Sequence, residues 1–125
     1  MIRYIELKSG YTDDGPAWIG RVKVSRTGQT VYFNGHAFKR ARGGYGRGNH
    51  IDIVTRESYW ISGVKKDGHD RHWAGKGKIT IESAVVAEYL LLTERTELDP
   101  ERYTVSDAIV PADPARFYDL ENKPL

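Results

Sequence analysis

The chain contains no cysteine, and this absence removes several kinds of site. Without thiols there is no disulfide framework, no thiolate metal site and no cysteine nucleophile. Lack of cysteine also fits a reducing compartment. The chain has no apolar run as long as a signal peptide or a membrane span, and its first ten residues, "MIRYIELKSG", alternate charged and apolar side chains. We therefore expect a cytoplasmic protein that does not enter a membrane.

The residues that are present indicate one folded domain. The length of 125 residues suits a single hydrophobic core, and the hydrophobic fraction of 39% with a charged fraction of 29% is typical of a globular chain. We predict a single domain over 1–125. It divides into a β-rich core over 1–82, a helix over 83–93 and an acidic, extended tail over 94–125.

The net charge of +2 hides an uneven distribution. Residues 36–78 hold ten Lys or Arg and four Asp or Glu, whereas residues 79–125 hold four and ten. A basic middle followed by an acidic end predicts two different surfaces. The acidic part either lies over the basic face and masks it, or forms a separate solvated surface.

Short segments of alternating polarity predict strands over most of the first 82 residues. Val22 and Val24 are expected to point inward, Gly28 to form a hairpin turn within 26–29, and 36–40 to continue the preceding strand past a bend at Gly35. The run 41–49 has four glycines in nine residues and is predicted to be a loop. The predicted strands are 3–8, 17–25, 30–35, 50–55, 58–64 and 78–82.

This pattern predicts a mainly β (α+β) fold, either a small antiparallel β-barrel or a curled sheet, with one C-terminal helix. The helix over 83–93 is expected to begin at Ser83 as N-cap and to plug or cover the sheet with an apolar stripe. Residues 102–110 are expected to add an edge strand. The last residues are expected to be extended, with Phe117 and Tyr118 as anchors.

Two runs, "GPAWIGRVKVSRTGQTVYFNG" and "YWISGVKKDGHDRHWAGKGKITI", resemble a group of short bacterial proteins of unknown function, over roughly the first 80 residues. Some of these proteins carry the name 1-deoxy-D-xylulose-5-phosphate synthase. Thiamine-diphosphate enzymes of that type are multi-domain and are marked by a Gly-Asp-Gly metal motif with a downstream Asn on an α/β fold. Here Asp67-Gly68 lacks the preceding glycine and lies in a β-rich context. The resemblance therefore implies family membership and no catalytic residue.

The Gly-rich segment "FKRARGGYGRGNH" is the first candidate binding element. It has four cations and no acid, with an aromatic side chain among its glycines. Arginine pairs with phosphate in a forked geometry, and an exposed aromatic ring stacks on a base. The competing interpretation is a solvated hairpin loop. No Walker or dinucleotide motif is present. The candidate ligand-binding residues are Lys39, Arg40, Arg42, Tyr45 and Arg47.

The second candidate element is "GVKKDGHDRHWAGKGK", residues 63–78. Its candidate ligand-binding residues are Lys65, Lys66, Arg71 and Trp73. A structural interpretation competes here too: Trp73 would be anchored in the core, and Arg71 would pair with Asp67 or Asp70 to hold the loop closed.

The histidines suggest two further kinds of site. His69 and His72 have metal-ligand spacing, but the sequence offers no third ligand, so no metal and no cofactor is predicted. His50 and His72 are the candidates for an acid–base pair that cleaves RNA without metal, since histidine titrates near neutral pH.

These features favour a small β-barrel binding module that contacts nucleic acid or another polyanion over an enzyme, without deciding between them. The first alternative is a protein–protein interaction module, which would bind a protein partner or form a homo-oligomer through an exposed aromatic face or edge strand. The second is a metal-independent phosphodiesterase resembling a ribonuclease.

Overall fold

The computed structural model describes residues 1–72, 75–111 and 113–121 and contains one nine-stranded sheet. Its strands follow the order β3-β4-β5-β6-β7-β1-β2-β8-β9. In chain order the strands are β1 (Ile2–Leu7), β2 (Ala17–Arg21), β3 (Lys23–Val24), β4 (Thr30–Phe33), β5 (His36–Tyr45), β6 (Gly48–Asp52), β7 (Ser58–Gly63), β8 (Ile79–Glu82) and β9 (Tyr103–Ser106).

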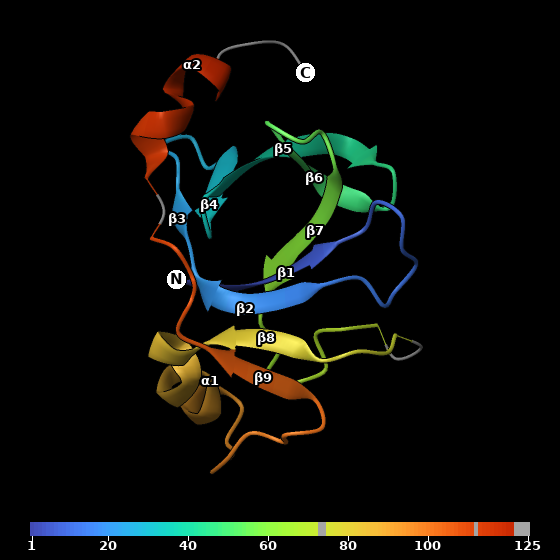
Figure 1. Ribbon diagram of the computed structural model, residues 1–125, viewed down its shortest axis with the longest axis vertical. Coiled ribbons are helices and arrows are strands. Elements are labelled where there is room, and N and C mark those ends of the chain that lie inside the picture. Colours follow the sequence, from blue (N-terminus) through green and yellow to red (C-terminus); the bar gives the residue numbers. More distant parts are fainter. Residues whose placement is uncertain (73–74, 112, 122–125) are drawn as a thin grey trace.

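The sheet curls because β2 and β3 are consecutive in the chain but far apart in the strand order. Only Val22 separates them, yet β3 is the first strand and β2 the seventh. Strands β3 to β2 therefore bend round until the strip returns to its starting segment (Figure 1). The sheet is not closed into a barrel, so the curled sheet is the correct member of the predicted pair.

Two apolar clusters lie on opposite faces of this sheet. One joins β1, β4, β5 and β7 across the inside of the curl and includes Ile5, Phe38 and Ile61. The other lies on the outer face, where Tyr4 and Ile19 pack against Tyr89. Both faces of β1 are therefore buried, which is why Tyr4 and Ile5, neighbours in the chain, are each fully inaccessible.

The outer cluster is covered by α1 (Val86–Leu92), which follows a 3-10 turn at Ser83–Val85. The predicted helix is therefore confirmed in place, but Ser83 is not its N-cap, because the turn begins from Glu82 without a side-chain cap bond. The helix joins β8 to β9, and these strands run parallel, as do β2 and β8. The remaining neighbours are antiparallel, so the prediction of a purely antiparallel sheet is wrong at this end. None of the helices formed by the described residues is long and apolar enough to span a membrane.

The turn at Asn34-Gly35 differs from the predicted bend. Phe33 pairs with His36 across it, so β4 and β5 form a tight hairpin rather than one strand. Asn34 and Gly35 have φ of 50° and 75°, as a type I′ turn requires. Val24 also differs from prediction, since it lies on the outermost strand and is exposed. The hairpin turn around Gly28 is confirmed.

The glycine-rich run 41–49, predicted as a loop, is mostly strand. β5 continues to Tyr45 and β6 starts at Gly48. The ladder shifts register between Arg40 and Tyr45, where two glycines take positive φ. At Gly48 a Cβ atom would lie 2.2 Å from the carbonyl oxygen of Tyr59, so only glycine fits there.

The C-terminal residues form a short helical segment instead of an extended tail. A 3-10 turn at Pro114–Phe117 leads into α2 (Tyr118–Glu121), and the Asp113 carboxylate accepts a hydrogen bond from the Ala115 amide. Phe117 is buried beside Tyr32, which confirms it as an anchor, whereas Tyr118 is exposed. The predicted edge strand at 102–110 is present as the shorter β9.

Candidate anion-binding surface

A cavity of about 250 Å³ lies on the outer face of the sheet, beyond the part that α1 covers. Trp60 on β7 pairs with Glu6 on β1, so the two side chains share this face. Glu6 is buried, whereas Trp60 remains 41% exposed and forms a wall of the cavity. The lining residues are Glu6, Lys8, Asp13, Arg47, Trp60, Lys65, Asp70 and His72.

The acidic floor of this cavity is neutralised from within the protein. The Glu6 carboxylate accepts hydrogen bonds from the Tyr4 hydroxyl and from the Lys8 ammonium group, at 2.7 Å for Lys8. The Arg71 guanidinium lies 3.9 Å from the same carboxylate. Burial, followed by the bond to Glu6, raises the pKa of Tyr4 and keeps its hydroxyl protonated. We name Glu6, Lys8 and Arg71 the buried ion cluster.

Arg71 was predicted to bind ligand, and the structure assigns it a different role. Its guanidinium donates to the carbonyl oxygens of Asp13 and Gly15 at 2.9 and 3.0 Å, and its side chain is 7% exposed. The predicted pairing with Asp67 or Asp70 is also absent from the bonds among the described residues. Arg71 therefore fastens the 63–72 segment to the turn after β1.

Asp70 holds the other end of this segment. One carboxylate oxygen accepts a hydrogen bond from the Lys65 amide at 2.7 Å, and the residue is 8% exposed. Burial raises the pKa of Asp70 above its ordinary value. The bond fixes the backbone at Lys65 while leaving the lysine ammonium group exposed at the cavity.

The β5–β6 hairpin presents a second set of cations. Arg40, Arg42 and Arg47 are exposed, and none of them has an ion-pair partner in the part of the chain that the structure describes. Tyr45, at the hairpin tip, is 43% exposed. Arg40 and Arg42 line a hollow of about 490 Å³ together with Asn49.

Asn49 places this hairpin against β7. Its side-chain amide donates to the carbonyl oxygen of Ile61 and accepts from the Ile61 amide, both at 2.9 Å. The side chain thus replaces a peptide unit where the regular ladder stops. Arg47, two residues earlier, is held near Trp60, and both line the outer-face cavity. The prediction of a loop over 41–49 missed this arrangement, for which the polar Asn49 directly before the strand predicted at 50–55 was the only sequence signal.

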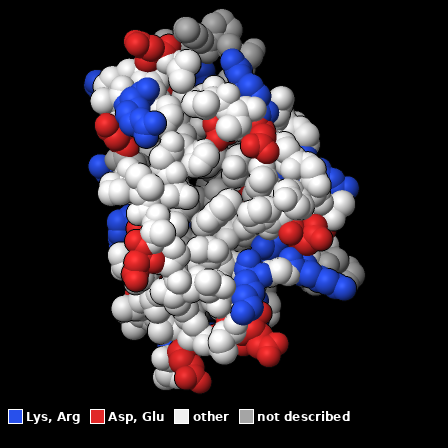
Figure 2. All heavy atoms as spheres, in the orientation of Figure 1, with Lys and Arg blue, Asp and Glu red and all other residues white. Residues whose placement is uncertain are grey.

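The structure brings together part of the predicted binding set. Arg47 and Lys65, one from each candidate segment, line one cavity, and Trp60, which was not among the predicted ligand-binding residues, joins them. Lys66 is exposed on the same segment as Lys65. On the face shown in Figure 2, Lys and Arg side chains form separate groups between Asp and Glu rather than one continuous basic field.

Lys39 and Trp73 stand apart from this set. The Lys39 ammonium group donates to the backbone carbonyl of Glu121 at 3.2 Å and lines a different cavity. Trp73 lies outside the described residues.

His50 and His72 differ too much in environment to support the acid–base pair. His50 is buried, and burial together with the nearby Arg40 charge lowers its pKa to about 4. His72 is exposed and lies 3.5 Å from Asp13. His72 lines the outer-face cavity and His50 does not. The described ranges also contain no cluster of three or more His, Asp or Glu residues that would hold a metal ion.

Comparisons with known proteins give no relative for this chain: no family model, curated protein or solved structure matches it.

Proposed function

We propose that this protein is a binding module for nucleic acid or another polyanion, which it contacts through the β5–β6 hairpin and the outer-face cavity. The observation that supports the proposal is a difference between neighbouring cations. Arg40, Arg42, Arg47 and Lys65 have no ion-pair partner among the described residues, whereas Arg71 is engaged inside the fold. Unengaged cations that line hollows are available to phosphate groups.

Trp60 supplies the second element of the proposed site. Its ring is 41% exposed beside Arg47 and Lys65. A base that stacks on an aromatic side chain gains about 1–3 kcal/mol, and this gain tolerates any sequence. The acids at the cavity do not oppose an anion strongly, because Lys8 neutralises Glu6 and lies 3.4 Å from Asp13. We therefore favour a single-stranded ligand bound without sequence readout.

The test is a binding titration with labelled single-stranded RNA at several salt concentrations, followed by fluorescence anisotropy. Each phosphate contact steepens the dependence of log K on log salt by roughly 0.7 for single strands. The Arg42→Ala/Arg47→Ala variant should therefore bind more weakly on every sequence, with a slope lower by about 1.4. Trp60→Ala should weaken binding by about 1–3 kcal/mol without changing the slope.

The matched control is Lys23→Ala/Arg56→Ala, which removes the same charge elsewhere. Lys23 lies on the edge strand β3, and Arg56 follows the end of β6 opposite to Arg47. This variant should retain the wild-type slope. Equal losses in both double variants would show a nonspecific charge effect, and RNA binding that is absent at low salt would reject the proposal.

A protein–protein interaction module is the second candidate, and one observation favours it. Strand β9 ends the sheet, pairs only with β8 among the described strands, and exposes Val105 by 52%. An unpaired edge can accept a strand from another chain. Light scattering over a range of protein concentrations tests this candidate: a monomer at all concentrations excludes self-association, and Val105→Lys should abolish any dimer that forms.

A further inference from the structure

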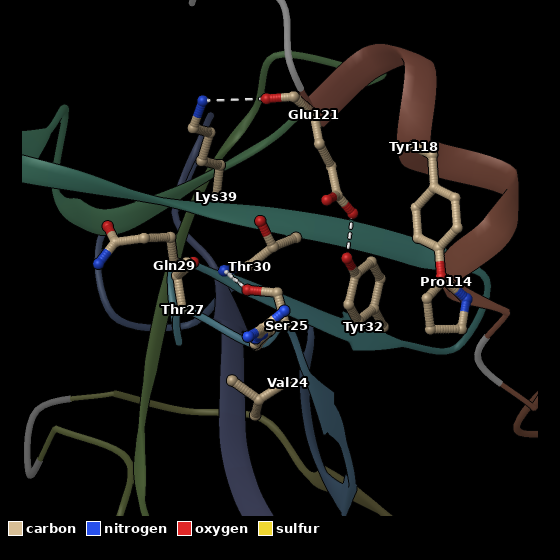
Figure 3. Close-up of a pocket in the computed structure, with 11 residues that line it drawn as sticks. Val24, Ser25, Thr27, Gln29, Thr30, Tyr32, Lys39, Pro114, Tyr118 and Glu121 are labelled. Atoms are coloured by element: carbon tan, nitrogen blue, oxygen red, sulfur yellow. Dashed lines mark hydrogen bonds between the residues drawn. The ribbon is translucent and has the colours of Figure 1, made fainter.

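A cavity of about 590 Å³ lies beside the hollow of Arg40 and Arg42, and Gln29 lines both. The β3–β4 hairpin forms one side of it, and the C-terminal helical segment forms the other. Figure 3 shows Lys39 and Glu121 at its upper end, with the Tyr32 hydroxyl directed up toward the Glu121 carboxylate and with Ser25 and Thr30 below Lys39 and Glu121. Its volume falls in the range of about 300–1,000 Å³ that is usual for small-molecule sites.

The charges in this cavity are incompletely matched. Lys39 donates to the backbone carbonyl of Glu121 and not to its carboxylate. The carboxylate instead accepts a hydrogen bond from the Tyr32 hydroxyl. Arg26 also lines the cavity and has no ion-pair partner in the described ranges. The cavity thus holds two cations and one carboxylate, and the carboxylate is bound to a phenol.

The hydroxyl groups add donors to the same space. The Ser25 oxygen accepts a hydrogen bond from the Thr30 amide at 3.0 Å, which leaves the hydroxyl proton of Ser25 able to donate. Tyr32 is buried, and burial followed by the bond to Glu121 raises its pKa, so its hydroxyl stays protonated at neutral pH. Two cations with hydroxyl donors are the groups that proteins use for phosphate.

The segment that carries Glu121 is short and held at few points. α2 has four residues, too few to be stable without packing. Phe117 provides that packing, since its ring is buried with its centroid 6.2 Å from that of Tyr32. The Glu121 side chain can therefore leave the Tyr32 hydroxyl while Phe117 remains in place.

We propose that this cavity is a separate site for a phosphate monoester, and that the Glu121 carboxylate occupies the position of the phosphate in the unliganded protein. Arg26 and Lys39 contact the phosphate, and the Tyr32 hydroxyl donates to it after Glu121 withdraws. This cavity borders the polyanion surface at Gln29, but its cations are different ones, because Arg42 and Arg47 do not line it.

The test is an NMR titration of the full chain with adenosine 5′-monophosphate, in which the amide signals of residues 25–32 are followed. Glu121→Gln removes the competing charge and should tighten binding about threefold to fivefold, the usual size of a single exposed charge effect. Arg26→Ala and Lys39→Ala should each weaken it by at least about threefold. Arg26 is exposed at a turn, so that variant retains the fold.

Two controls separate this site from general electrostatics and from the proposed function. Asp119→Asn removes one negative charge from α2 at a position that does not line the cavity, and should leave the affinity unchanged. Arg42→Ala/Arg47→Ala should bind the nucleotide as the wild type does. The proposal is overturned if the signals of residues 25–32 do not shift saturably, or if Asp119→Asn tightens binding as much as Glu121→Gln.

Discussion

The buried ion cluster and the β5–β6 hairpin use the same side-chain chemistry in opposite ways. Arg71 donates to two carbonyl oxygens and lies beside Glu6, with 7% of its side chain exposed. Arg42 and Arg47 project from a hairpin whose glycines bring no acid near them. A cation in a basic segment is therefore available to a ligand only where the fold gives it no partner, and spacing in the sequence does not reveal this.

The largest expected difference between the two regions appears when an acid is removed. Glu6→Ala removes the carboxylate beside Arg71 and leaves Lys8 with Asp13 alone at 3.4 Å, and breaking a buried ion pair costs about 3–5 kcal/mol. We expect urea unfolding to show that loss. Glu101→Ala removes an exposed acid and should change the free energy of unfolding by less than about 0.5 kcal/mol. A loss below about 1 kcal/mol for Glu6→Ala would mean that the cluster is not a structural unit.

A smaller effect on the free energy of unfolding is expected from the protonation of His50, which lies on β6 of the hairpin. The pKa of His50 is near 6.5 in the unfolded chain and about 4 in the folded protein, so the folded state binds fewer protons between these values. The contribution of neutral His50 to the free energy of unfolding is therefore fully present above pH 6.5. It is lost as the pH falls to 4, which lowers the free energy of unfolding by about 2–3 kcal/mol. When urea unfolding is measured between pH 6.5 and 4, the free energy of unfolding of His50→Gln should not show this fall.

A substitution at Arg40 separates the two causes of the lowered pKa of His50. Burial is the larger cause of the lowered pKa of His50, and the Arg40 charge is the smaller one. Arg40→Ala should therefore move the pH window upward only slightly. If it removes the pH dependence altogether, electrostatic repulsion rather than burial controls His50.

The smallest expected effect is on the stability of the exposed hairpin. Arg42→Ala/Arg47→Ala should change the free energy of unfolding by no more than about 0.5 kcal/mol, because neither side chain has an ion-pair partner among the described residues. Thermal unfolding by circular dichroism measures it. Loss of RNA binding with unchanged stability would show that these arginines serve binding, whereas Glu6 serves stability. A large destabilisation would show that these arginines are structural.

Local patterns predicted the elements of this fold better than their pairing. Alternating polarity located most strands, and the apolar stripe over 83–93 located the helix that covers the outer face. The parallel pairing of β8 with β2 depends on contacts about sixty residues apart, and no local propensity encodes it. The Asn34-Gly35 dipeptide is typical of a two-residue hairpin turn, but the prediction of one strand bent at Gly35 did not use this signal.

The candidate surface was predictable as a set of residue types and not as a geometry. Composition selected Arg42, Arg47 and Lys65, but the engagement of Arg71 with Glu6 required knowing that both faces of β1 are covered. Glycine-rich sequence also suggested a loop at 41–49, because glycine is unfavourable in strands. In this run, the glycines take positive φ and the Asn49 amide replaces a backbone bond, so the strands pair irregularly. The alternation of polar and apolar residues does not predict such pairing.

The position of β8 has a consequence for the order in which this chain folds during synthesis. The strip from β3 to β2 is complete once residue 63 has emerged from the ribosome, but its β2 edge waits for residues 79–82. Until then the nascent protein presents a row of open backbone groups that can pair with another chain. A polypeptide halted between these points therefore carries an open sheet edge that favours aggregation.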